Sequence, residues 1–269
     1  MILYAMTAQV SAIKLFTAGI LPSIFIGIVD AIYVMVYARI KMVPLSSPAR
    51  WKNIWASTEA SWTIGTIVVI FGGIYGGVFT PTEAAAVAVV YSLFVAMVIY
   101  REVDFAELGR IMVSSVALIS QILIIVTGAG IYSWLMTTSG IPQNLIDAVS
   151  ALHLPNWQTL LFVNAGLLIA GSFLEPQAAI LILTPLLLPV VEAAGINALH
   201  FGIIMAVNLS IGLYMPPFGL NLFAARAIFN VPMGMIYRGV LPFIAINFAA
   251  LLVITYVPAI SMVLIGAVR

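Results

Sequence analysis

Long apolar runs, separated by short polar or Pro- and Gly-rich segments, set the pattern of this chain. Four stretches hold no Asp, Glu, Lys or Arg at all: residues 111–146, 148–174, 193–225 and 239–268. Each stretch is longer than the roughly 20 residues that a helix needs to cross a lipid bilayer. The pattern therefore predicts an all-α polytopic membrane protein.

The polar segments between the runs predict where the individual helices lie. We expect apolar helical segments over residues 2–18, 19–39, 62–79, 83–100, 111–137, 157–173, 177–191, 199–212 and 218–230, and a last span within 239–268. We expect an interruption of the run 111–137 at residues 127–130, which read TGAG, and a short amphipathic piece at 140–152.

The longest polar stretch runs from Arg39 to Glu59 and contains two prolines and several Lys, Arg and Trp residues. Interfacial Trp beside clustered basic residues is typical of loops on the cytoplasmic face of a membrane. A loop that is merely solvated requires similar residues. The composition of this stretch favours a cytoplasmic loop.

Composition excludes several classes of protein. Hydrophobic residues make up 64% of the chain and charged residues 7%, against roughly 45–50% and 25% in soluble domains. The net charge of +1 gives no reason to expect nucleic acid as a partner. With no cysteine there is no disulfide and no thiolate site. The sequence patterns of ATP-binding loops, serine hydrolases and zinc proteases are also missing, so we do not expect an enzyme.

A proline-containing break separates two apolar segments at residues 208–221, which read NLSIGLYMPPFGLN. Its adjacent prolines lack N–H donors and disfavour helical backbone before them, and Gly212 and Gly219 permit unwinding. We expect carbonyl oxygens near Gly212 and Leu213 to lose their helical donors, which suits a small cation such as Na⁺. The alternative is a proline kink whose carbonyls are satisfied by neighbouring helices.

A second break, at residues 171–177, joins two apolar segments that are short for full spans. Two short helices meeting at a tight polar tip predict a re-entrant helical hairpin. Glu175 is isolated from other charges, and an ionisable group at membrane depth is a functional candidate by default. If the tip instead reaches the headgroups, Glu175 is an ordinary interfacial charge. Pro176 fits the first turn of the second helix.

The remaining polar positions give weaker signals. Glu83, three residues after a threonine, is expected to cap a helix. Arg226 meets either an anionic substrate or the membrane surface. Asp30, inside the first span, serves either ion coupling or pairing between helices. His153 and His200 are expected in loops and show no metal-ligand spacing.

Several motifs resemble the large membrane subunit, of the DctM type, of tripartite ATP-independent periplasmic (TRAP) transporters. The two longest are residues 72–91, GGIYGGVFTPTEAAAVAVVY, and 208–223, NLSIGLYMPPFGLNLF. Shorter matches occur at 141–143, 180–189 and 200–204. The motifs are long and stand in the family's order over nearly the whole chain, which makes the resemblance specific.

The resemblance implies a multi-pass bacterial inner-membrane protein that imports organic acids with Na⁺ by an elevator-type movement. C4-dicarboxylates, sialic acids and keto acids are all compatible substrates. The implied partners are a small four-helix membrane subunit, a periplasmic substrate-binding protein and the surrounding lipid. Large subunits of this family are longer, so the chain resembles their C-terminal part, the second of two inverted repeats, and the missing N-terminal repeat is a further implied partner.

The resemblance also divides the chain. Residues 1–60 correspond to scaffold helices and a cytoplasmic linker, 61–238 to the transport-domain repeat, and 239–269 to the final scaffold helix. Within the repeat, the family's hairpin falls on 157–191 and its Pro-Pro broken helix on 199–230.

These features predict an ion site and a substrate path at the two breaks. The Na⁺ ligands are expected to be backbone carbonyls of the break, completed by the hairpin tip: Gly212, Tyr214, Met215, Ser172 and Pro176. The residues expected near substrate are Glu175, Asn208 and Asn221. We expect no cofactor beyond Na⁺ as the coupling ion.

Two other classes compete with a transporter subunit. An intramembrane enzyme is disfavoured by the missing nucleophile and metal motifs. A non-transporting membrane scaffold or remnant is favoured if the first repeat is absent altogether. Because half of a repeat-built transporter leaves broken helices without their partner, residues 1–269 alone are expected to insert into a membrane without driving uptake.

Overall fold

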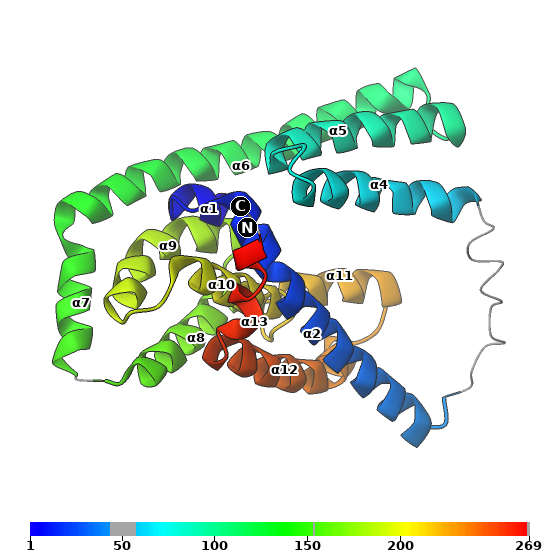
Figure 1. Cartoon of the computed structure of the whole chain (residues 1–269). Coiled ribbons are helices and arrows are strands. Elements are labelled where there is room, and N and C mark those ends of the chain that lie inside the picture. Colours follow the sequence, from blue (N-terminus) through cyan, green and yellow to red (C-terminus); the bar gives the residue numbers. More distant parts are fainter. Residues whose placement is uncertain (44–57, 153, 268–269) are drawn as a thin grey trace. The chain divides into compact units, whose positions relative to one another are not determined.

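The computed structural model describes residues 1–43, 58–152 and 154–267, and all regular elements in these ranges are helical (Figure 1). Within these ranges, five helices are long and apolar enough to cross a membrane. This confirms the predicted all-α polytopic class. Most of the predicted cytoplasmic loop, at 44–57, and His153 lie outside the described residues.

The chain divides into two compact units. One contains Met1–Tyr37 with Ile122–Arg269, and the other contains Ala38–Gln121. The smaller unit consists of α4 (Thr58–Tyr75), α5 (Pro81–Phe94), the π-helical turn η1 (Val95–Ile99) and the first part of α6 (Phe105–Ser139). α4 and α5 pack against each other, and Tyr91 of α5 donates a hydrogen bond to the carbonyl of Trp62 at 3.0 Å.

α5 begins with the cap that the sequence predicts. Thr80 Oγ1 accepts a hydrogen bond from the backbone N–H of Glu83, and the Glu83 carboxylate accepts one from the backbone N–H of Thr80 at 2.8 Å. Pro81 occupies the first helical position, where its missing N–H has no intrahelical partner to lose. The capping role predicted for Glu83 is confirmed.

The N-terminal elements differ from the prediction. α1 is only Ile2–Thr7, and α2 begins at Ala12 and continues to Ile40. The chain turns between them because Gln9 adopts a left-handed backbone with φ of 54°. The expected division at residue 19 was therefore wrong, and Gly19 lies buried inside α2.

α6 is also more continuous than expected. Residues 127–130 do not interrupt it, and the helix runs unbroken to Ser139. Thr127 Oγ1 donates to the carbonyl of Leu123 at 2.8 Å, which satisfies the hydroxyl inside the helix. Glycine lowers helix stability by only about 1 kcal/mol, so two glycines in a long apolar run do not break it.

The larger unit is built around a buried central helix (Figure 1). Its elements are α1, α2, the end of α6, α7 (Ile141–Ala151), α8 (Asn156–Phe173), α9 (Pro176–Ala193), α10 (Ala198–Gly212), α11 (Leu220–Phe229), α12 (Met233–Tyr256), α13 (Ala259–Met262) and the 3₁₀ turn η2 (Ile265–Ala267). α10 packs against α8, α9 and α12, and its Phe201, Ile204 and Met205 are fully buried. A helix that is apolar all round belongs in such a core.

The last span begins earlier than predicted. α12 starts at Met233, directly after Pro232, and includes Arg238, which was expected to precede the span. It ends at Tyr256, and Pro258 introduces the short α13. Because proline fits the first turn of a helix and disfavours helical backbone before it, Pro232 and Pro258 fix these two boundaries.

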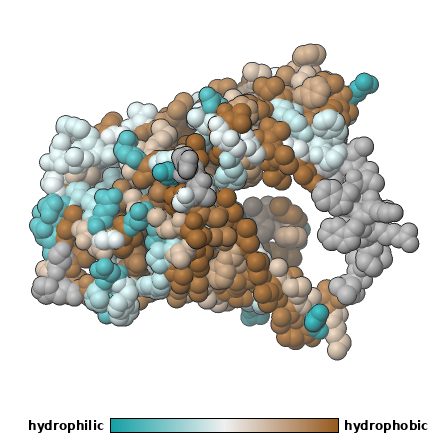
Figure 2. All heavy atoms as spheres, in the orientation of Figure 1, coloured by the Kyte–Doolittle hydropathy of each residue, from teal (hydrophilic) through white to brown (hydrophobic). Residues whose placement is uncertain are grey.

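Hydrophobic side chains cover much of the visible face of the protein (Figure 2). On α6, for example, Val113, Ile119 and Ile124 expose 74%, 54% and 74% of their surface. A helix with such residues on its exterior matches a lipid environment rather than water.

Candidate functional site

The predicted hairpin consists of α8 and α9, which Leu174 and Glu175 join in a tight connection. Glu175 has extended backbone and precedes Pro176, the first residue of α9. The proline at this position ends one helix and begins the next without losing a hydrogen bond. The tight tip and the place of Pro176 in the first turn of α9 are thus as the sequence predicts.

The predicted broken helix consists of α10, which ends at Gly212, and α11, which begins at Leu220. The segment between them contains a cis peptide bond at Pro216–Pro217. It folds back tightly at Gly219, where an added Cβ would lie 2.7 Å from the carbonyl oxygen of Leu213. Only glycine fits so close to another part of the backbone.

Two glycines bring the hairpin and the broken helix into backbone contact. A Cβ placed on Gly212 would lie 2.5 Å from the carbonyl carbon and 2.6 Å from the carbonyl oxygen of Gly171. Phe173 and Phe218 also face each other, with ring centroids 5.2 Å apart. The structure therefore places the hairpin tip against the break, and Ser172 follows Gly171 directly in this contact.

Three carbonyls of the break are not free, contrary to the expectation of a cluster of unpaired oxygens. The carbonyl of Gly212 accepts from the N–H of Met215 at 3.1 Å, and that of Met215 accepts from Gly219 at 3.0 Å. The carbonyl of Leu213 accepts from Asn221 at 2.9 Å. The unwound backbone thus replaces lost helical bonds with local turns. Since a carbonyl oxygen has two lone pairs, each retains one for a further partner.

The polar side chains of the predicted ion and substrate sites are divided between interior and surface. Ser172 is 5% exposed, and its hydroxyl donates to the carbonyl of Ile169 at 2.7 Å. Its oxygen lone pairs remain available to a cation. Glu175 at the tip and Asn221 on the first turn of α11 are exposed.

Asn208 lies one turn before Gly212 and is completely buried. Its Nδ2 donates to Asn164 Oδ1 at 2.6 Å and to the carbonyl of Ile204 at 3.0 Å. Its Oδ1 has no hydrogen-bond partner in the described part of the chain. A buried amide oxygen without a donor is unfavourable by about 1–3 kcal/mol. Among the side-chain polar atoms of Asn208 and its partner Asn164, this oxygen is therefore the one that is open to a ligand or water.

The sequence analysis missed Asn164, which lies inside α8 and links three helices. Its Nδ2 donates to the carbonyl of Leu160 at 2.9 Å and to Thr255 Oγ1 of α12 at 3.2 Å. The available signal was an isolated amide in an otherwise apolar segment, because such residues in membrane helices generally bond across the helix interface.

His200 is inside α10 rather than in a loop, which corrects the sequence-based expectation. It is 3% exposed, and its ring nitrogens lie 3.2 Å from Ser261 Oγ and 3.1 Å from the carbonyl of Thr255. Since both nitrogens have partners on α12 and α13, His200 fastens these helices together. No cluster of three His, Cys, Asp or Glu side chains suited to a metal ion occurs among the described residues.

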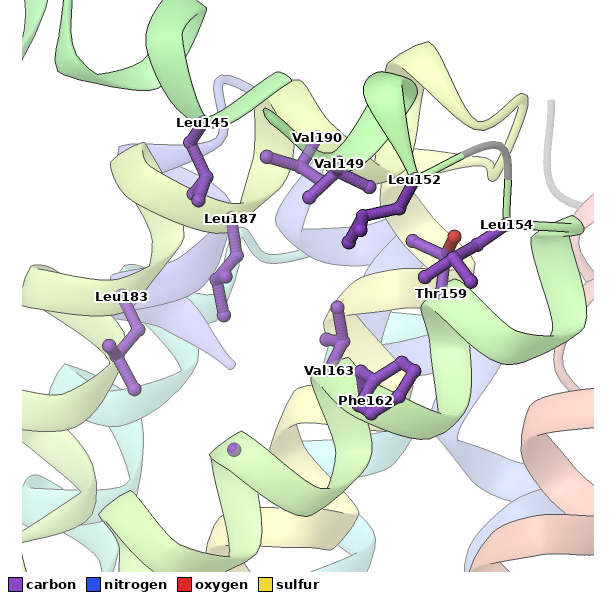
Figure 3. Close-up of a pocket in the computed structure, with 11 residues that line it drawn as sticks. Leu145, Val149, Leu152, Leu154, Thr159, Phe162, Val163, Leu183, Leu187 and Val190 are labelled. Carbon is purple, nitrogen blue, oxygen red and sulfur yellow. The ribbon is translucent and has the colours of Figure 1, made fainter. Parts of the chain in front are cut away.

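A pocket of about 340 Å³ lies between α7 and the hairpin (Figure 3). Its lining is almost entirely apolar, with Leu145, Phe162 and Leu187 among the side chains that point into it. Thr159 is the one hydroxyl in the lining. A ligand with charged or polar groups has few partners here, so this pocket is not the predicted ion or substrate site.

Comparison with known proteins gives a consistent result. Residues 1–260 match the family described as tripartite ATP-independent periplasmic transporter, DctM component. The chain is 42% identical, over 98% of its length, to a protein of Pseudomonas aeruginosa named as C4-dicarboxylate TRAP transporter large permease protein DctM. It is 38% identical to a protein of the same name from Rhodobacter capsulatus, over 93% of its length.

A further relative, from Oleidesulfovibrio alaskensis, is named as an isethionate TRAP transporter permease protein DctMQ and is 38% identical over 98% of the chain. The chain covers only part of each relative: 62% of the Pseudomonas protein, 57% of the Rhodobacter protein and 42% of the Oleidesulfovibrio protein. It thus spans less than two thirds of the length of these permeases.

Proposed function

Because the chain belongs to the DctM family of TRAP transporter large permease proteins, we propose that it forms the C-terminal part of a subunit that imports organic acids together with Na⁺. It is a multi-pass protein of the bacterial inner membrane, and its relatives are named as permease proteins rather than enzymes. In this proposal the hairpin α8–α9 and the broken helix α10–α11 carry the ion and substrate, and they move relative to scaffold helices in an elevator-type step.

The observation that carries the proposal is the contact between Gly171 and Gly212. It joins two interrupted helical elements at their polar ends, inside a protein that is otherwise apolar. Irregular backbone at membrane depth is tolerated only where protein, water or a ligand satisfies it. Secondary transporters place their coupling ions at such interrupted helices.

The proposed Na⁺ site combines carbonyls of Gly212, Tyr214 and Met215 with the tip residues Ser172 and Pro176. The local hydrogen bonds at Gly212 and Met215 occupy one lone pair of each carbonyl and leave the other for the ion. Ser172 Oγ has its proton engaged with Ile169, which orients its lone pairs away from that bond. Oxygen ligands of this kind suit a small hard cation.

The proposed substrate path runs along Glu175, Asn208 and Asn221. Glu175 and Asn221 are exposed, and Asn208 Oδ1 is a buried acceptor without a partner among the described residues. The relatives named for C4-dicarboxylates and for isethionate suggest an organic anion as substrate. A nearby Na⁺ would offset the negative charge of such a substrate and of Glu175.

The proposed partners follow from the family. They are a small four-helix membrane subunit, a periplasmic binding protein that delivers substrate, and the N-terminal repeat of the large subunit. The lipid bilayer surrounds the exposed apolar faces of α2, α6 and α12, and no nucleic acid is involved.

The substitution Gly212→Val tests the ion site. Its side chain would enter the backbone of Gly171 and push the hairpin tip away from the break, so the Na⁺ concentration for half-maximal uptake is expected to rise at least several-fold. The measurement is uptake of a labelled organic acid by the complete reconstituted transporter at graded Na⁺. The control is Gly166→Val on α8, where an added Cβ meets nothing within 4 Å. Unchanged Na⁺ dependence in the Gly212 variant would overturn the proposed site.

A further inference from the structure

The apolar pocket between α7 and the hairpin continues into a second, smaller pocket. The first, of about 340 Å³, is lined on α7 by Leu145, Val149 and Leu152 (Figure 3). The second, of about 130 Å³, lies where α8 begins and α9 ends, and Asn156 is part of its lining. Four residues, one of them Thr159, line both pockets. The two therefore form one site, which is apolar along most of its length and polar at one end.

Thr159 supplies a hydroxyl without a partner where the two pockets meet. A threonine hydroxyl in a helix often donates to the carbonyl one turn earlier, as Thr17 and Thr127 do at 2.9 and 2.8 Å. At Thr159 that carbonyl, of Pro155, already accepts from two backbone N–H groups. The Thr159 hydroxyl bonds none of the described residues, although Thr159 is only 5% exposed. Its oxygen opens onto the pockets, and groups at such low exposure normally have a partner.

The polar end of the site lies at the level of the membrane surface. Trp157, which follows Asn156, is 54% exposed, and its carbonyl accepts a hydrogen bond at 2.8 Å from Tyr256 at the end of α12. Trp and Tyr are enriched where helices leave the hydrocarbon. From there the apolar pocket follows α8 past Val163, which is about 10 Å along the helix axis from Asn156. The site thus runs from the membrane surface into the hydrocarbon.

α7 covers the site as an amphipathic helix. Its residues that line the pocket are spaced four and three positions apart and so share one face. Gln143 and Asp147, which bond each other at 3.0 Å, are exposed on the opposite face. Helices of this kind lie in the plane of the membrane surface. Leu152 and Phe162, which line the pocket, are each 65% exposed, so the pocket is open to surrounding lipid.

The chemistry of the lining selects an uncharged, mainly apolar ligand. Among the described residues, no charged side chain lines either pocket, so an ion or a charged headgroup finds no counterion there. An apolar space left empty loses the dispersion contacts of its lining. Lipid tails are as apolar as leucine side chains and are the apolar molecules at hand in a bilayer.

From the apolar length, the polar end and its level in the membrane, we propose that this site binds one acyl chain of a membrane glycerolipid. The chain occupies the larger pocket, and its ester group lies in the smaller one. There the Thr159 hydroxyl and the Asn156 side-chain amide donate hydrogen bonds to the ester carbonyl. The charged headgroup remains outside. The lipid thereby fills the space between α7 and the hairpin, and its binding requires neither Na⁺ nor substrate.

The test is photo-crosslinking of the complete purified transporter in nanodiscs. The probe is phosphatidylcholine with a diazirine in one acyl chain, and mass spectrometry locates the crosslinked residues. We expect crosslinks at the pocket residues of α7, α8 and α9 to exceed those on the exposed apolar face of α6. Val149→Phe and Leu183→Phe fill the pocket from two different helices, and each should lower the pocket crosslinks several-fold. The matched control is Val113→Phe on α6, at a position 74% exposed, which should leave them unchanged.

Thr159→Val tests the polar end of the site, because it removes the hydroxyl and keeps the shape of the side chain. In the wild-type protein the diester probe should crosslink several-fold better than its diether analogue, which lacks ester carbonyls, and Thr159→Val should abolish this preference. Equal crosslinking by the two probes in the wild type would overturn the placement of the ester. Pocket crosslinks that are no denser than those on α6, and that neither filling variant lowers, would overturn the proposal. Neither result bears on the proposed ion site, which is measured by the Na⁺ dependence of uptake.

Discussion

Individual polar residues in this protein act mainly by joining helices that apolar packing alone would not align. Asn164 and Asn208 bond to each other across α8 and α10, and Asn164 continues to Thr255 on α12. In an apolar surrounding, an amide that loses its partner has no water to replace it. Gly171 and Gly212, at the contact between the hairpin and the break, join their elements without side chains, because they allow the two backbones to meet directly.

The asparagine pair can be tested with a double-mutant cycle. Asn164→Leu and Asn208→Leu each strand the partner amide, so each should lower the stability of the folded state by about 1–3 kcal/mol. The double variant removes both amides and should be less destabilised than the sum of the single variants. The measurement is the thermal unfolding midpoint of the purified membrane complex. Strict additivity would show that the 2.6 Å bond contributes nothing.

At the scale of single elements, prolines and capping residues determine where helices begin and end. Thr80 and Glu83 begin α5, and Pro176 begins α9. These boundaries follow rules of local chemistry that act over three or four residues.

Thr80→Ala tests the cap of α5. It removes the acceptor for the Glu83 N–H and should destabilise the start of the helix by about 1 kcal/mol, the usual value for an N-cap. We expect faster hydrogen–deuterium exchange over the first turn of α5 than in the wild-type protein. The control is Thr82→Ala, two residues later, at an exposed position outside the cap. Equal exchange in the two variants would contradict the capping role.

The hairpin tip can be tested by chemical labelling, which is simple because the chain has no cysteine. Glu175 is exposed at the tip, and Leu167, two turns earlier on α8, is 0% exposed. In the complete transporter, Glu175→Cys should react with a water-soluble thiol reagent and be protected by substrate, whereas Leu167→Cys should remain unreactive. A cysteine at 175 that is inaccessible from both sides of the membrane would contradict a tip on the substrate path.

The sequence predicted the elements that local chemistry determines. It did not predict features that depend on contacts between residues far apart in the chain. The hairpin tip and the Pro-Pro break were found because proline and glycine have local effects. The hydrogen bond to the Leu213 carbonyl was not predicted, because its donor is the N–H of Asn221, eight positions later. The burial of His200 depends on Thr255 and Ser261, a contact that no local pattern reveals.

At the scale of the whole molecule, this chain is a family member that spans less than two thirds of the length of its relatives. Its larger unit contains the N-terminal helices together with the hairpin and the broken helix. This unit therefore includes residues that the resemblance assigned to the scaffold as well as residues that it assigned to the transport repeat. The proposed transport activity requires a second interrupted repeat to complete the site. The partner subunits and the N-terminal repeat therefore belong to the functional unit in this account.

The most direct test of this account is uptake of a labelled organic acid into proteoliposomes under an imposed inward Na⁺ gradient. Residues 1–269 alone should insert but give no uptake above protein-free liposomes. Adding the N-terminal repeat, the small subunit and the binding protein should produce uptake that collapses when the Na⁺ gradient is removed. Uptake by residues 1–269 alone, or uptake by the complete assembly that persists without Na⁺, would contradict the account.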